Sequence, residues 1–153
     1  MRVLILLLLV PLSTWEHPLP EKLNIPLKQL ELEPQEISDS ICKELGVNSE
    51  FMRDLAQCES GWRWVTGSYG DKGYFQIIPS TFRYWSKKLN LKGHSERNNI
   101  IVAAHYIKHL HNRYGSYYKA RFAYGRGSWR HPYTWTCMEE AFMRKVNWRK
   151  YDR

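Results

Sequence analysis

The longest periodic stretch of the sequence, residues 95–114, reads SERNNIIVAAHYIKHLHNRY. Its apolar side chains recur every three or four residues, which places Ile100, Ile107 and Leu110 on one side of a helix. Gly115 follows the last periodic residue and is a typical helix stop. The stretch therefore predicts a central helix against which other elements can pack.

Shorter helices are expected on both sides of this stretch. Pro34 opens a helical pattern that Gly46 stops, and Asn48 or Ser49 caps a second helix that runs to about Cys58. The remaining pattern predicts a loop at 61–71, a β-prone run at 73–78, and helices at about 79–89, 117–123 and 136–146. No internal repeat is visible. Because most of these segments are helical, we expect one mainly α domain with a short β-hairpin region.

Length and composition agree with one folded domain that has a basic surface. The chain has 153 residues, of which 43% are hydrophobic and 14% aromatic, which excludes global disorder and fibrous classes. Its net charge of +8 is uneven, because residues 16–50 hold eight acidic and three basic residues, whereas residues 51–153 hold seven and nineteen. Such a basic domain suits nucleic acid, an anionic membrane or a cell-wall polymer.

The N-terminal residues are typical of an exported protein. Arg2 precedes about ten apolar residues, too few to span a bilayer of roughly 30 Å as a helix. We therefore expect a signal peptide at 1–14, a proline-rich linker at 15–33 and the folded domain at 34–153. The cleavage site lacks a clear small-residue pattern, so an uncleaved membrane tether remains an alternative.

Glu59 interrupts an apolar face. At 100° per residue it projects within about 40° of Met52 and Leu55, which lie seven and four residues before it. Such a carboxyl group is either a surface residue just past the helix end or an acid in a partly dry pocket, where its pKa rises. The second arrangement provides a general acid that is still protonated near neutral pH.

Three motifs follow one another in the chain: Cys58-Glu59-Ser60-Gly61-Trp62, Gly73-Tyr74-Phe75-Gln76-Ile77 and Ala123-Tyr124-Gly125-Arg126-Gly127. Their order resembles the lysozyme-like soluble lytic transglycosylases of glycoside hydrolase family 23. The run 56–61, with Cys137 far downstream, is also similar to the resuscitation-promoting factors. The resemblance covers about residues 37–137 and implies a lysozyme-like fold.

Carried over by position, the resemblance makes Glu59 the catalytic acid and Ser60 its orienting neighbour. It also makes Gln76 and Tyr124 polar liners of the cleft. Gly125 departs from the family, which usually has Asn at this position, so one expected substrate contact is missing or replaced. Among the aromatic residues near the motifs, Trp62 and Tyr74 could pack against flat sugar faces, although many aromatic residues are simply core.

The implied reaction cuts the β-1,4 bond between N-acetylmuramic acid and N-acetylglucosamine in peptidoglycan and leaves 1,6-anhydromuramoyl ends. The implied location is the periplasm, the cell wall or the medium, and we expect a monomer without cofactor. Asp71 offers an alternative, because goose-type lysozymes carry an Asp in a similar context and hydrolyse the bond. The simpler interpretation is that Asp71 makes a turn, and we favour it.

Three further features of the sequence bear on partners, metal binding and disulfides. A basic protein that binds nucleic acid or the wall without catalysis is the non-enzyme alternative, but no nucleic-acid-binding motif is visible and no nucleic-acid partner is expected. His105 and His109 have metal-ligand spacing, yet Tyr106 stands where a zinc protease needs Glu, so no metal site is expected. An exported chain with three cysteines suggests one disulfide; the resemblance favours Cys58–Cys137, with Cys42–Cys58 as the competitor.

Overall fold

A computed structural model describes residues 32–153, which form one compact unit. The predicted signal peptide at 1–14 and nearly all of the predicted linker at 15–33 lie outside the described residues. The first helix, α1, begins at Pro34.

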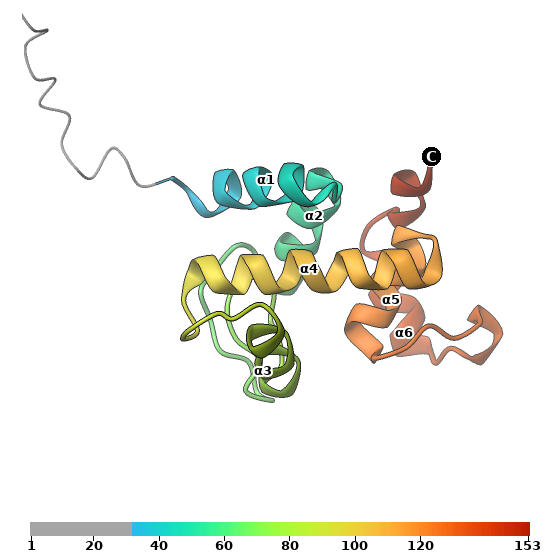
Figure 1. Ribbon diagram of the computed structural model, residues 1–153. Helices are drawn as coiled ribbons and strands as arrows, with labels where there is room; N and C mark the ends of the chain where they lie inside the picture. The colour runs from blue at the N-terminus through green and yellow to red at the C-terminus, as the bar shows by residue number, and fades with distance from the viewer. Residues whose placement is uncertain (1–31) are drawn as a thin grey trace, which may run out of the picture. The chain divides into compact units, whose positions relative to one another are not determined.

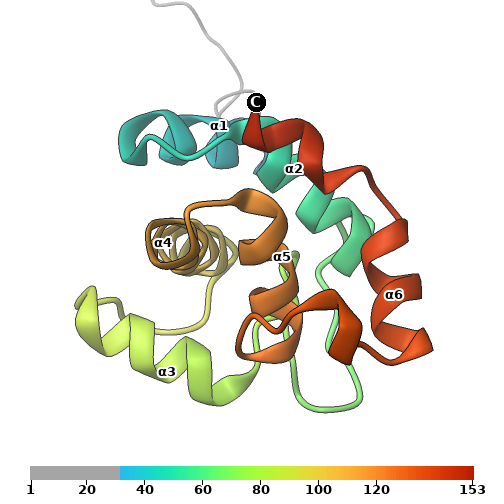
Figure 2. The same ribbon diagram turned by 90° about the vertical axis from the view of Figure 1, so that its right-hand side faces the viewer.

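The domain is mainly helical, as predicted, and α4 (Glu96–Tyr114) lies at its centre (Figure 1). Figure 2 looks along α4 and shows α1 (Pro34–Leu45) above it, α3 (Pro79–Lys88) below it and α5 (Tyr117–Arg126) beside it. The other elements are α2 (Ser49–Glu59), α6 (Cys137–Arg144) and the short 3-10 helices η2 (Pro132–Thr134) and η3 (Trp148–Asp152). α2 packs against α1, and η3 packs against α5.

Local signals explain where these helices begin and end. The side chain of Asn48 caps α2 by accepting a hydrogen bond from the Phe51 amide at 3.0 Å. Gly46 and Gly115 end α1 and α4 in the left-handed conformation, with φ of 67° at both residues. Each helix turns its apolar residues inward, and Phe51, Leu55 and other side chains of one face of α2 are fully buried.

The expected β-hairpin at 73–78 is not formed. Only two isolated bridges, Thr66–Lys72 and Lys72–Ile77, occur in the described part of the chain. The reason is that Asn99 of α4 holds this segment as a compact loop: its Oδ1 accepts from the Phe75 amide at 3.2 Å, and its Nδ2 donates to the Lys72 carbonyl at 2.9 Å. Tertiary hydrogen bonds have overridden the β propensity of the segment.

The expected disulfide is also not formed, and all three cysteines are free thiols. Cys42 is buried inside the core, where burial raises its pKa to about 11, while Cys58 is half-buried and Cys137 is exposed. Within residues 32–153, no helix has the length and apolar character that crossing a membrane requires.

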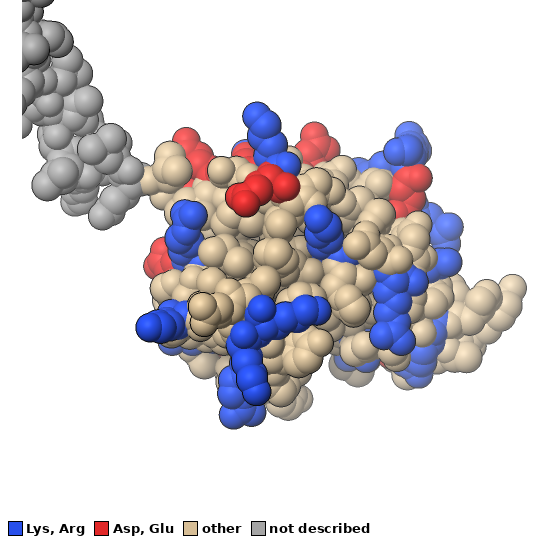
Figure 3. All heavy atoms as spheres, in the orientation of Figure 1, with Lys and Arg blue, Asp and Glu red and all other residues tan. Residues whose placement is uncertain are grey.

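Charge is distributed unevenly over the surface, as the sequence indicates. On the face in Figure 3, acidic side chains gather mainly along the edge formed by α1, whereas Lys and Arg cover the parts formed by α3 and the C-terminal elements. The basic character of residues 51–153 is thus displayed on the surface of the folded domain.

Candidate active site

Glu59 is the last residue of α2, and the structure places it in a hollow rather than in open solvent. Its side chain is 19% exposed. The hollow has a volume of about 280 Å³, and its other lining residues come from the loop after α2 and from α5 and α6: Tyr69, Asp71, Gln76, Ile78, Tyr124, Gly125, Arg126 and Phe142. The helix end and three separate segments therefore converge on one carboxyl group.

Burial sets the protonation of Glu59. Loss of solvent raises the pKa of the Glu59 carboxyl above its ordinary range, and the negative charge of Asp71 adds to this shift. The cations of Arg121 and Lys145 oppose the shift without cancelling it. A carboxyl group with a raised pKa keeps more of its proton toward neutral pH, which is what a general acid needs.

Arg121 is the partner of Glu59 that the sequence analysis missed. Its Nη1 lies 2.8 Å from Oε1 of Glu59, and its side chain is 1% exposed. The contact is an ion pair without aligned hydrogen-bond geometry, since neither Nη1 nor Nε of Arg121 has a hydrogen-bond partner. The sequence holds one signal for this residue: Arg121 lies four residues after Tyr117 and three before Tyr124, so it shares a helix face with two aromatic residues.

Ser60 follows Glu59 in the chain and is buried. Its hydroxyl donates to the Tyr74 carbonyl at 2.8 Å and accepts from the Arg63 amide at 3.2 Å. Ser60 does not line the hollow. Its hydroxyl instead joins the end of α2 to the loop at 73–77, a position suited to orienting the site.

Gln76 and Tyr124, which the resemblance implies as polar liners of a cleft, both lie at the hollow around Glu59. Nε2 of Gln76 donates to the carbonyls of Gly73 and Val65 at 2.7 and 3.1 Å, which holds the side chain in place. The Tyr124 hydroxyl donates to the Phe75 carbonyl at 2.6 Å, and burial raises its pKa well above the ordinary value. Both groups are therefore fixed in position and uncharged.

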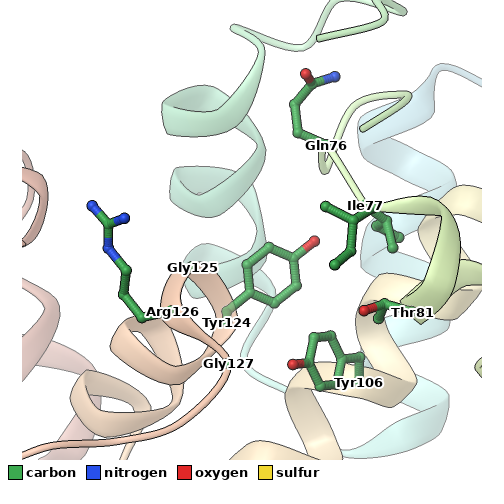
Figure 4. A pocket seen from close by; sticks show the side chains of 9 residues that line it. Gln76, Ile77, Thr81, Tyr106, Tyr124, Gly125, Arg126 and Gly127 are labelled. Atoms are coloured by element: carbon green, nitrogen blue, oxygen red, sulfur yellow. The ribbon is translucent and has the colours of Figure 1, made fainter. Parts of the chain in front are cut away.

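A second hollow of about 470 Å³ adjoins the first and shares five lining residues with it: Gln76, Ile78, Tyr124, Gly125 and Arg126. Figure 4 shows the Tyr124 ring between Arg126 on one side and Thr81 and Tyr106 on the other, with its hydroxyl directed toward the segment that carries Gln76. The two hollows together offer an extended surface on which a chain-like ligand could lie.

Trp62 and Tyr74 do not reach the hollow around Glu59. Tyr74 is buried and donates its hydroxyl to Oε2 of Glu96, at the start of α4, at 2.7 Å. Trp62 packs on the rings of Tyr74 and Phe75, with centroids 5.9 and 5.8 Å away. Both aromatic residues therefore take part in packing the loop, and contacts of their rings with sugars stay a prediction.

Asp71 makes a turn and also lies at the hollow. It makes the predicted turn, because its Oδ1 accepts from the Tyr69 amide at 3.2 Å and its carbonyl accepts from the Gly67 amide at 2.7 Å. It also lines the hollow that contains Glu59.

The glycine at 125 has a steric cause in this fold. A Cβ built at this position would lie 2.5 Å from Cζ of Phe142, so the larger Asn of the related motif could not fit without displacing that ring. Phe142 of α6 thus takes the space next to Tyr124 that a longer side chain would use.

No group of three His, Cys, Asp or Glu side chains in residues 32–153 is arranged to hold a metal ion. His105 and His109, the pair with metal-ligand spacing, both lie near the Trp85 ring, with centroid distances of 6.5 and 5.6 Å.

Comparison with known proteins supports the resemblance noted in the sequence. A lytic transglycosylase Slt from Pseudomonas aeruginosa, solved as an inactive mutant, matches with a TM-score of 0.57 and 22% identity over 61% of this chain and 16% of that chain. The 70 kDa soluble lytic transglycosylase Slt70 from Escherichia coli matches with a TM-score of 0.55 and 21% identity over 60% and 16%. At this identity the likeness shows a shared fold, and the chain spans about a sixth of either protein.

No curated protein sequence matches the chain. The model of one family, described as the transglycosylase SLT domain, matches residues 37–134, which is well over half of the chain and includes all three motifs around Glu59. The chain therefore belongs to the transglycosylase SLT domain family.

Proposed function

We propose that this protein is an exported peptidoglycan lytic transglycosylase with Glu59 as its general acid and base. The observation that carries the proposal is the half-buried carboxyl of Glu59 at the end of α2, in a hollow where burial raises its pKa. One carboxyl group is sufficient for this reaction, whereas most glycosidases need a second one as nucleophile or base.

In the first step Glu59 donates its proton to the oxygen of the glycosidic bond between N-acetylmuramic acid and N-acetylglucosamine. The C1–O bond breaks, and the acetamido group of the muramoyl residue stabilises the positive charge that develops at C1. In the second step the Glu59 carboxylate takes the proton of the muramoyl C6 hydroxyl while O6 bonds to C1. The ring closes to a 1,6-anhydro sugar, no water is consumed, and Glu59 regains its proton.

The surroundings of Glu59 suit a polymer that carries both sugars and carboxylates. Gln76 and Tyr124 provide fixed polar groups along the two adjoining hollows. Arg126 lines both hollows and could meet a lactyl or peptide carboxylate of the wall strand, because its ion pair with Glu139 is loose, at 3.9 Å. Export, with cleavage or retention of the N-terminal segment as a tether, rests on the sequence of residues 1–14.

A lysozyme-like hydrolase is the second candidate, because Asp71 lines the same hollow as Glu59. A carboxylate in that position could activate a water molecule, as the base of an inverting glycosidase does. The transglycosylase is favoured because the Asp71 side chain is already engaged by the Tyr69 amide in a turn.

Digestion of purified peptidoglycan followed by mass spectrometry of the products tests the proposal. A transglycosylase gives anhydromuramoyl ends, which are lighter than hydrolysed ends by one water, or about 18 Da. The Glu59→Gln variant should remain folded and release no product. Reducing muramic acid as the main product would assign the protein to the hydrolases, and lysis by a folded Glu59→Gln variant would remove Glu59 from its role.

A further inference from the structure

Arg121 is a buried cation whose position calls for an explanation. Its side chain is 1% exposed, and its guanidinium lies 3.9 Å from the ring centroid of Phe142 in α6 and 5.2 Å from that of Trp148 in η3. Burying a charge is costly unless the charge is paired. Within residues 32–153, the only carboxylate within 4.0 Å of Arg121 is that of Glu59.

We propose that Arg121 is a positioning residue for Glu59: its guanidinium, stacked on Phe142, holds the Glu59 carboxyl in the hollow and is the counter-ion of its carboxylate form. This inference rests on the proposed function, since it assigns a task within that reaction. We do not assign Arg121 a contact with substrate, because its side chain is buried and is not among the residues that line the hollow.

The packing around Arg121 restricts where its charge can point. The planar guanidinium can stack on an aromatic ring through its face while its edge remains free to meet a carboxylate. Phe142 takes that stacking position and also lines the hollow. Nη1 of Arg121 lies 2.8 Å from Oε1 of Glu59, and Nε of Arg121 has no hydrogen-bond partner. Packing thus orients the Arg121 guanidinium, and the ion pair with this guanidinium orients the Glu59 carboxyl group.

The proposed reaction explains why Glu59 would need such a partner. Glu59 must hold a proton before the first step and must be a carboxylate between the first and the second. Burial favours the protonated form, and Arg121 favours the ionised form. A site with both influences can hold either form during one turnover.

Other titratable and charged groups near Glu59 also affect its pKa or line its hollow. Lys145, just after α6, acts in the same direction as Arg121, and Asp71 from the loop acts against it. Arg126 and the neutral hydroxyl of Tyr124 line the same hollow. The thiol of Cys58, next to Glu59 on α2, is kept neutral by burial, which raises its pKa. Arg121 is the only one of these cations within 4.0 Å of Glu59.

The experiment compares Arg121→Met, which removes the charge but keeps an unbranched side chain, with Arg121→Lys, which keeps the charge. Titration of the Glu59 carboxyl, followed by ¹³C NMR of the full-length protein without substrate, should give a higher pKa in Arg121→Met than in the wild type. Arg121→Lys should titrate close to the wild type. Arg121→Gln is a second neutral variant, for the case in which Arg121→Met does not fold.

Wall lysis measured across pH provides the second readout. Because Glu59 must start protonated, the alkaline limb of the activity profile should move to higher pH in the neutral variants. The maximal rate should fall about 10- to 100-fold, as expected when a catalytic group loses its fixed position. Arg121→Lys should restore the limb to its wild-type position and recover part of the rate.

A purely structural role for Arg121 makes a different prediction. Loss of Arg121 would then lower stability and activity, but the Glu59 titration would be the same in folded wild type and folded neutral variants. That result would overturn the inference. The titration needs no substrate, so it remains decisive if the protein cleaves no peptidoglycan, and failure of the proposed function is recognised separately.

Discussion

Replacing Gly125 by Ala tests how closely α5 and α6 pack beside the site. The added Cβ would lie 2.5 Å from Cζ of Phe142 and 3.1 and 3.3 Å from its two Cε atoms, whereas ordinary contacts begin at 3.4 Å. The Phe142 ring would have to move by roughly 1 Å within a close-packed contact. The ring also stacks on Arg121, so it cannot move without loosening that contact.

Two effects of opposite sign compete in this variant. Ala in place of Gly in a helix should stabilise the protein by about 0.5–1 kcal/mol. Overpacking of a close contact should destabilise it by about 1–3 kcal/mol. The clash exceeds the helix gain, so we expect a net loss of about 1–2 kcal/mol, or a fall in Tm of roughly 3–10 °C for a domain of this size.

Urea unfolding followed by tryptophan fluorescence measures the change, and a second background provides the control. In Phe142→Ala the obstructing ring is absent, so adding Gly125→Ala should stabilise the protein by about 0.5–1 kcal/mol. The sign of the effect should therefore reverse between the two backgrounds. A stabilising effect of Gly125→Ala in the wild-type background would refute the steric account of this glycine.

The remaining predictions concern the proposed reaction and the loop that supports it. Glu59→Gln should release no muropeptides, while its circular dichroism spectrum and Tm stay near those of the wild type. Mass spectrometry of the digest and thermal melting of both proteins measure these two outcomes. Asp71→Asn should keep most of the activity and still give anhydromuramoyl ends; loss of activity together with a reducing-end product in the wild type would contradict it. Ser60→Ala should lower the free energy of unfolding by about 1–3 kcal/mol, because the Tyr74 carbonyl loses its buried donor, whereas Ser80→Ala on the exposed start of α3 should have little effect in the same urea titration. Stability should also fall as the pH drops below 6.5, the ordinary pKa of His94, and this acid sensitivity should shrink in His94→Gln.

The direction of the His94 effect follows from its contacts. Burial, assisted by the charge of Lys72, lowers the pKa of His94 in the folded protein. The unfolded chain therefore binds more protons just below pH 6.5, and stability rises with pH across that window. Asn99 presents its Nδ2 to Nε2 of His94 at 3.2 Å while donating to the Lys72 carbonyl, so Nε2 must act as an acceptor. Thermal melts of the wild type and His94→Gln at acidic and neutral pH measure the difference.

The helices, and the helix face on which Glu59 lies, could be predicted from the sequence because their signals are local. Asn48 caps α2 by accepting from the amide of Phe51, three residues later in the chain. Gly115 ends α4 and donates its amide to the carbonyl of His111, four residues earlier. The placement of Glu59 on an apolar face needs only the helical period. Such features depend on neighbours within about four residues, so the order of residues is sufficient to predict them.

Packing between distant segments decided the rest of the site. Arg121 meets Glu59 across 62 positions of the chain, and Phe142 fills the space beside Gly125 from another helix. Asn99 turns the β-prone segment at 73–78 into a loop, and in that loop the Tyr74 hydroxyl finds Glu96 instead of a ligand. These contacts depend on how the helices cross and on which buried polar groups pair with one another. The spacing of residues along one segment predicts neither of these.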